Sequence, residues 1–197
     1  MKVLVFGATG GTGRQVVEQA RAAGHEVTAF TRAAHGDVTT DRDAVARALR
    51  GQDAVISALG RGNSFRSNQL MSRSMDVILP AMEREGVRRL IVLSSFGVGD
   101  TYDDAPLLPK VFFRLFLRHI YADKEIADDF VRRSDLNWTL VYATKLTDGP
   151  RTGRVRAGER LELRGMPKIS RADVADFIVK QLGDDTWVGK TVIISAA

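Results

Sequence analysis

Cysteine is absent from the 197 residues of the chain, which excludes disulfide bonds and a thiolate nucleophile. The three histidines are scattered without the spacing of metal ligands, so we expect no metal site. No apolar run approaches the ~20 residues that cross a membrane, and the chain enters an expected strand at once, with no room for a signal peptide. We therefore expect a cytoplasmic protein with no membrane partner.

A basic cluster interleaved with aromatic side chains is also missing, although Lys and Arg outnumber Asp and Glu by 29 to 24. The net charge of +5 suits an anionic ligand, but without such a cluster a nucleic acid is not the expected partner. The length and the 44% hydrophobic content predict one globular domain over residues 1–197, with a substrate-pocket segment at about 96–122 and 143–169. We expect a small-molecule ligand and a monomer or weak homodimer.

The first 23 residues combine an expected strand, a glycine turn and an expected helix. Residues 2–6 are apolar without alternation, as in a strand buried on both faces of a parallel sheet. Apolar residues from Val16 to Ala23 then fall on one face of a helix. Between the two stands Gly7-Ala-Thr-Gly-Gly-Thr-Gly13, in the context that makes such glycines a nucleotide-binding fingerprint.

Each glycine of this turn has an expected role. Gly7 permits the tight turn, Gly10 or Gly11 lets the backbone approach a pyrophosphate, and Gly13 lets helix and strand pack closely. Backbone N–H groups at the start of the helix would then face the phosphate. The segment is predicted to be a nucleotide-binding βαβ unit.

The end of the second expected strand bears on the choice of cofactor. An NAD site usually carries Asp or Glu about 20 residues after the glycines, to bind the ribose 2′-hydroxyl. Here Thr31 and Arg32 stand 18 and 19 residues after Gly13. A guanidinium can bind a 2′-phosphate that a carboxylate would repel, so we expect NADP(H) in preference to NAD(H). The alternative is a solvated surface arginine.

The next segment is unusually short. Only residues 33–36 separate Arg32 from Asp37-Val38, too few for a crossover helix and a full third strand, unless a piece is missing from this sequence. In the doubly wound order the third strand lies at an edge, so its loss leaves the core intact. We predict an α/β fold with a Rossmann-like, doubly wound parallel sheet in a single domain, whose third strand is reduced or absent.

Periodicity predicts the remaining elements. Expected strands lie within 26–31, 53–60, 88–93, 137–142 and 191–194, the last closing the sheet, and expected helices within 40–49, 71–82, 124–131 and 170–182. Residues 143–165 are expected to be mostly loop with one short hairpin.

The expected helix at 110–119 has apolar residues all round. Its Phe112, Phe113 and Phe116 would form a substrate-pocket wall, or else a subunit contact or a membrane-surface helix, in that order of preference.

Seven motifs follow one another along nearly the whole chain: Gly7-Ala-Thr-Gly-Gly-Thr-Gly13, Arg32, Gly36-Asp37-Val38, Asp53-Ala-Val-Ile, Ser94-Ser95, Ser134-Asp-Leu-Asn-Trp-Thr139 and Ile169-Ser-Arg-Ala-Asp-Val174. In this order they resemble the atypical short-chain dehydrogenase/reductases. More narrowly, they resemble the NmrA-like NAD(P)H-binding proteins that include the flavin reductase and biliverdin reductase B group.

The resemblance implies NADPH bound across the glycine turn, with Arg32 on its 2′-phosphate and Asp37 and Val38 beside its adenine. The implied contacts of the turn itself are Gly7, Thr9, Gly10, Gly11, Thr12 and Gly13. The resemblance also implies Ala58, Leu59 and Gly60 along the diphosphate-ribose, and Ser94, Ser95, Ala143, Thr144 and Lys145 near the nicotinamide.

The wider superfamily typically uses a Tyr-x-x-x-Lys pair, in which the tyrosine is the general acid. Lys124 matches the lysine, but Ile120 stands four residues earlier and Tyr121 comes one residue late. One residue turns a helical side chain by about 100°. The catalytic candidates are Ser95, Lys124 and Tyr121. The alternatives are a capping role for the serine, a ribose contact or a solvated position for the lysine, and a packing or pocket role for the tyrosine.

The missing tyrosine does not forbid reduction, because flavins, quinones and linear tetrapyrroles accept hydride into conjugated systems and can take their proton from solvent. The main hypothesis is an NADPH-dependent oxidoreductase for a planar conjugated acceptor, with Lys145 as a cationic anchor. One alternative is a catalytically silent, NADP(H)-sensing NmrA-like regulator. Another is a biosynthetic ketone reductase or isomerase that uses Tyr121 or Lys124 as its acid or base.

Overall fold

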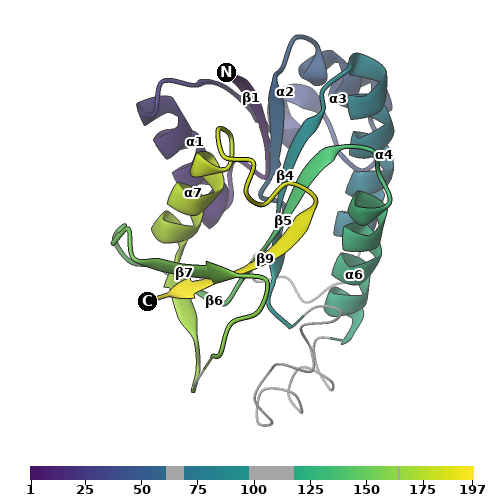
Figure 1. Cartoon of the computed structure of the whole chain (residues 1–197). Helices are drawn as coiled ribbons and strands as arrows, with labels where there is room; N and C mark the ends of the chain where they lie inside the picture. The colour runs from purple at the N-terminus through teal and green to yellow at the C-terminus, as the bar shows by residue number, and fades with distance from the viewer. Residues whose placement is uncertain (61–68, 98–117, 164) are drawn as a thin grey trace.

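Figure 1 shows the computed structural model of the chain, in which one large twisted sheet stands between two layers of helices. The structure describes residues 1–60, 69–97, 118–163 and 165–197, and of residues 118–121 it describes the backbone. The expected helix at 110–119, with its three phenylalanines, therefore lies almost wholly outside the described residues.

The larger sheet has the strand order β2-β1-β3-β4-β5-β9-β7, and β6 and β8 form a separate pair. The strands are β1 (Lys2–Phe6), β2 (Glu26–Phe30), β3 (Ala54–Ser57), β4 (Arg89–Ser95), β5 (Asn137–Ala143), β6 (Lys145–Thr147), β7 (Val155–Gly158), β8 (Lys168–Ser170) and β9 (Lys190–Ala196). The described helices are α1 (Gly11–Ala22), α2 (Arg32–His35), α3 (Arg42–Leu49), α4 (Leu70–Glu85), α6 (Arg118–Arg132) and α7 (Arg171–Lys180). In this spatial order, every neighbouring pair from β2 through β1, β3, β4 and β5 to β9 is parallel, which confirms the Rossmann-like fold.

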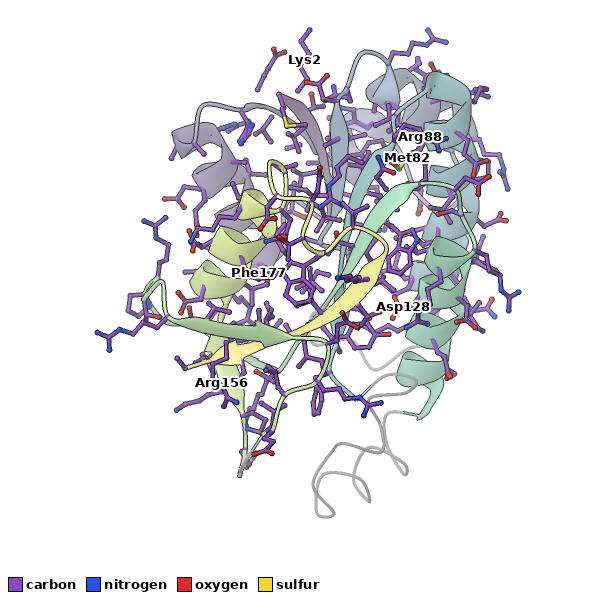
Figure 2. The ribbon with its side chains drawn as sticks, in the orientation of Figure 1. Lys2, Met82, Arg88, Asp128, Arg156 and Phe177 are labelled. Carbon is purple, nitrogen blue, oxygen red and sulfur yellow. The ribbon has the colours of Figure 1, made fainter. Side chains whose placement is uncertain are left out.

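Alternate residues of β1 point into two separate cores, as the pleat of a strand requires. Val3 and Val5 belong to a cluster with residues of α1 and α7, whereas Leu4 and Phe6 belong to a cluster with residues of α3, α4 and α6. In Figure 2, Met82 on α4 and Phe177 on α7 lie on opposite sides of the sheet. Both faces are thus covered, which explains the unbroken apolar run of the first strand.

The predicted loss of the third strand is confirmed. Every residue between β2 and β3 is described, and this segment contains the short α2 and the helix α3 but no strand. β2 is therefore the edge of the sheet. Phe30 at its end contacts the rings of Phe6 and His35, each with a centroid distance of 4.9 Å. These ring contacts close the core where a further strand would otherwise lie.

The opposite edge differs from the prediction. The expected hairpin within 143–165 is wrong, because β7 pairs antiparallel with β9, and β6 pairs in parallel with β8. The final strand is also not the edge, since β7 lies outside it. These partners are far apart in the sequence, and a local pattern carries no information about such pairings.

Two predicted helix starts are confirmed. Asp41 accepts a hydrogen bond from the backbone N–H of Ala44 at the start of α3. Ser170 accepts one from the backbone N–H of Asp173 at the start of α7. Each side chain satisfies an N–H group that has no partner inside its helix.

Gly13 is where α1 approaches the glycine turn most closely, because a Cβ atom there would lie 2.0 Å from the carbonyl oxygen of Gly7. Backbone cannot yield as a flexible side chain does, so we expect Gly13→Ala to lower the free energy of unfolding by about 3 kcal/mol. The matched control is Gly183→Ala, where a Cβ meets no atom within 4 Å and the change should stay within about 0.5 kcal/mol. Urea unfolding of both variants measures this, and equal stabilities would contradict the packing role.

Candidate functional site

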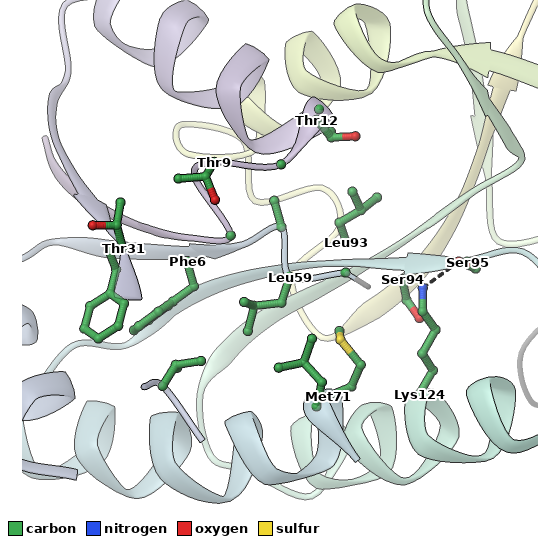
Figure 3. A pocket seen from close by; sticks show the side chains of 18 of the residues that line it. Phe6, Thr9, Thr12, Thr31, Leu59, Met71, Leu93, Ser94, Ser95 and Lys124 are labelled. Carbon is green, nitrogen blue, oxygen red and sulfur yellow. Dashed lines mark hydrogen bonds between the residues drawn. The ribbon is translucent and has the colours of Figure 1, made fainter. Parts of the chain in front are cut away.

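A cavity of about 700 Å³ opens at the carboxyl ends of β1, β2, β3 and β4. Ligands of open α/β sheets bind at this edge, and the volume is in the range of small-molecule sites. Many of the predicted site residues line it: Gly7, Thr9, Gly10, Gly11, Thr12, Arg32, Val38, Ala58, Leu59, Gly60, Ser94, Ser95 and Lys124. Figure 3 shows the glycine turn on one side of this cavity and Lys124 on the other. The structure thus brings together residues that were selected from distant parts of the sequence.

The glycine turn places backbone against backbone. Gly7 has a φ of +74°, and a Cβ atom there would lie 2.4 Å from the carbonyl oxygen of Ala58, so only glycine fits. The N–H of Gly10 bonds to the carbonyl of Gly7 at 3.0 Å. α1 begins directly afterwards without a side-chain cap. The amide groups of its first turn are therefore available to an anionic ligand in the cavity.

Arg32 lies at the mouth of the cavity, and 76% of its side chain is exposed. Its guanidinium is 3.0 Å from a carboxylate oxygen of Asp37. Asp37 in turn accepts hydrogen bonds from the hydroxyl and the N–H of Thr39, which with the charge of Arg32 lower the pKa of its carboxyl. Val38 is buried and lines the cavity, whereas Asp37 does not. Arg32 is thus at once a cavity residue and an exposed arginine.

The nicotinamide end predicted for the cavity holds a lysine and a serine in contact. The Nζ of Lys124 on α6 donates a hydrogen bond of 2.6 Å to the Oγ of Ser95 at the end of β4 (Figure 3). Both residues line the cavity. The side chain of Tyr121, the third catalytic candidate, lies outside the described residues.

Among the predicted residues whose side chains the structure describes, five do not line the cavity. Gly13 is buried within α1, Asp37 is partly exposed beside Arg32, and Ala143 and Thr144 are buried at the end of β5. Lys145 is exposed at the start of β6, where its neighbour Leu146 reaches the cavity instead. A role of these residues in binding stays a prediction.

Sequence reasoning missed a buried network behind Ser94. The hydroxyl groups of Ser94 and Tyr142 each donate a hydrogen bond of 2.8 Å to one carboxylate oxygen of Asp128, and Arg132 donates to the Tyr142 hydroxyl at 2.9 Å. Asp128 is 2% exposed between α6 and the sheet (Figure 2). Burial raises the pKa of its carboxyl, and the bonds from Tyr142 and Ser94 offset part of that rise. The available signal was its position four residues after Lys124, on the same helical face.

Asp123 was missed as well. α4 begins after Gln69, which has left-handed backbone and no capping side chain. The carboxylate of Asp123 accepts hydrogen bonds from the N–H groups of Met71 and Ser72, each at 3.0 Å, and so caps α4 from α6. These two hydrogen bonds hold α6 against α4 directly beside Lys124. Its signal in the sequence is hidden, because the two helices are about 50 residues apart.

Neither a metal site nor a membrane span emerges from the described part of the chain. Its residues hold no group of His, Cys, Asp and Glu side chains that could bind a metal ion. No helix among the described residues is long and apolar enough to cross a membrane.

Comparison with known proteins agrees with this geometry. Residues 7–185 match the NAD(P)H-binding family. The chain belongs to that family. It is 26% identical over 204 residues to the uncharacterised sugar epimerase YhfK of Bacillus subtilis, with 93% of this chain and 89% of YhfK covered. The predicted resemblance is thereby confirmed at the level of the family, and a nicotinamide dinucleotide is the ligand that the family description names.

Solved structures of the same fold cover the whole chain. A Bacillus halodurans protein, provisionally named an NAD-dependent epimerase/dehydratase, is 26% identical with a TM-score of 0.84, and 94% of its chain is covered. SP1627 of Streptococcus pneumoniae, provisionally named an NADH-flavin reductase, is 25% identical with a TM-score of 0.78, and all of its chain is covered.

The buried carboxyl of Asp128 predicts how stability depends on pH. A pKa raised above the ordinary 3.8 means that the folded state favours the protonated form, so stability falls as pH rises through the folded-state pKa. Asp128→Asn cannot ionise and escapes this loss. We expect its free energy of unfolding to gain on that of the wild type as the pH rises from about 4, measured by urea unfolding over a pH series.

The control is Asp135→Asn, which changes an exposed carboxylate of the turn after α6. Its unfolding free energy should follow that of the wild type at every pH. If the curves of Asp128→Asn and the wild type run parallel, the proposed effect of burial is wrong.

Proposed function

We propose that the protein is an NADPH-dependent oxidoreductase that delivers hydride to a planar conjugated acceptor such as a flavin, a quinone or a tetrapyrrole. One observation carries the proposal: a single cavity joins the uncapped start of α1 to the hydrogen-bonded Lys124 and Ser95. The name of SP1627 points to the same class of acceptor.

The residues present fit a dinucleotide. The free amides of the first turn of α1 suit a diphosphate, and the close approach of Gly7 to Ala58 leaves the cavity floor free of side chains there. Val38 and Leu59 offer apolar surface for a flat ring, and Arg32 offers a cation for a 2′-phosphate. A reduced nicotinamide, when bound, supplies the hydride.

The chain itself contributes orientation and a proton. The ammonium of Lys124 donates its hydrogen bond to Ser95 and leaves the Ser95 O–H directed away from Nζ. That hydroxyl can donate to an electronegative atom of the acceptor while the positive charge beside it stabilises the charge that the acceptor gains. Asp123, by capping α4, holds α6 and with it Lys124 in place. Solvent can restore the proton, so no tyrosine is required.

If Ser95 and Lys124 together deliver a proton, removing either side chain should lower kcat without abolishing the reaction. Ser95→Ala and Lys124→Met should each lower kcat for NADPH oxidation with FMN or a quinone by about 10- to 100-fold, less than complete general-acid catalysis would cost, because solvent still supplies protons. Lys180→Met, which removes an exposed α7 lysine that pairs with Asp176, should leave kcat unchanged.

Two other outcomes would favour the two alternative functions. A loss above about 100-fold in Tyr121→Phe would favour a ketone reductase or isomerase that uses the tyrosine as its acid. A melting shift with NADPH, without turnover of any flavin, quinone or tetrapyrrole, would favour a cofactor-sensing regulator.

The preference for NADPH is part of the proposal and is tested separately. Because 76% of Arg32 is exposed, its contact with a 2′-phosphate should have the strength of a solvated charged hydrogen bond. Arg32→Gln should raise the Kd of NADPH about 10-fold and leave that of NADH within about twofold, measured by calorimetry. Arg42→Gln, an exposed arginine paired with Asp76 outside the cavity, is the control and should change neither. If Arg32→Gln raises the Kd of NADPH and of NADH by the same factor, the assignment of Arg32 to the 2′-phosphate is wrong.

A further inference from the structure

A second arginine reaches the cavity from an element that sequence reasoning did not connect with the cofactor. Arg171 is the first residue of α7, and its side chain lines the cavity together with Gly10, Gly11 and Thr12. α1 and α7 share one core on the same face of the sheet, and both begin at its carboxyl edge. A cation of α7 is thereby placed at the N-terminus of α1.

The residues on either side of Arg171 fix the start of α7 by hydrogen bonds. Ser170 caps α7 through the N–H of Asp173 at 3.0 Å. Asp173 is almost fully buried, and its carboxylate accepts hydrogen bonds from the N–H groups of Thr152 and Gly153. The start of α7 is therefore anchored to the loop before β7, and the guanidinium is presented from a rigid base.

Gly11 shows where the side chain of Arg171 runs. A Cβ atom on Gly11 would lie 2.9 Å from both the Cδ and the Nε of Arg171. The φ of Gly11 is not in the left-handed region, so its backbone does not itself require glycine. The missing side chain at this position instead leaves room for the arginine. The guanidinium consequently lies over the first turn of α1, where the amide groups have no side-chain cap.

In this structure Arg171 forms an ion pair with Asp148, a residue at the protein surface. Its NH1 group is 2.6 Å from a carboxylate oxygen of Asp148, whose side chain is 91% exposed. An ion pair whose carboxylate is so exposed contributes little in water, although the Arg171 side chain itself is only 30% exposed. A diphosphate offers more charge and oxygens that match the guanidinium fork. Exchange of Asp148 for a diphosphate is therefore favourable.

We infer that Arg171 is a diphosphate-binding residue of this cavity, and that Asp148 occupies its guanidinium until a dinucleotide replaces the carboxylate. The inference rests on the cofactor site of the proposed function and not on the hydride transfer. It distinguishes two cations: Arg32 would contact only the 2′-phosphate, and Arg171 the diphosphate that NADPH and NADH have in common.

The test compares dinucleotides with a mononucleotide by calorimetry. Arg171→Gln should raise the Kd of NADPH and of NADH by the same factor, about 10- to 100-fold, and change that of AMP, which lacks the diphosphate bridge, by less than about threefold. Arg151→Gln removes an exposed arginine that pairs with Asp176 outside the cavity, and should change none of the three.

A second variant keeps the test independent of folding. Asp148→Asn removes the competing carboxylate and leaves Arg171 in place, so both dinucleotides should bind about two- to fivefold more tightly. The inference is overturned if Arg171→Gln leaves both dinucleotide affinities within twofold, or if Asp148→Asn weakens them. Wild-type protein that binds dinucleotides through Arg171 but reduces no acceptor would refute the oxidoreductase proposal and leave this inference intact.

Discussion

Close contact between backbone and backbone at the glycine turn is the constraint on which the rest of the structure depends. A Cβ at Gly7 would collide with the carbonyl of Ala58, and one at Gly13 would collide with the carbonyl of Gly7. These two approaches bring the start of α1, the end of β1 and the end of β3 to one point. Backbone amide groups are therefore part of this wall of the cavity, where an anion can reach them.

The far wall of the cavity is held by polar contacts within the core instead. Asp123 caps a helix that lacks its own cap, and Asp128 gathers the hydroxyls of Ser94 and Tyr142. Both carboxylates belong to α6, on either side of Lys124. A buried carboxylate is tolerated only where several donors meet it, so these contacts fix the rotation of α6 and thus the direction of its lysine.

Local sequence pattern was enough to predict most of the fold but not all of the site. The strand, turn and helix at the N-terminus, the missing third strand and the starts of α3 and α7 all depend on neighbours in the sequence, and all are confirmed. The pairings of β6 and β7 join distant segments, and the prediction there was wrong.

The two buried carboxylates were missed for the same reason, because their partners lie on other elements of the fold. Arg171 belongs to the motif Ile169-Ser-Arg-Ala-Asp-Val174, but no residue near it in the sequence indicates that it lies beside Gly11, 160 positions earlier. A sequence pattern indicates the chemistry that a residue can provide, but only the packed structure shows which other residues it contacts.

The absence of a third strand has a consequence for adaptation. The segment from the end of β2 to Asp41 takes part in no sheet pairing, and its residues Arg32 and Asp37 meet at the surface. Exchanges of these two residues break no ladder hydrogen bond and remove no side chain from either core. If Arg32 sets the choice between NADPH and NADH as proposed, single substitutions at this surface would change that choice at little cost to the free energy of unfolding.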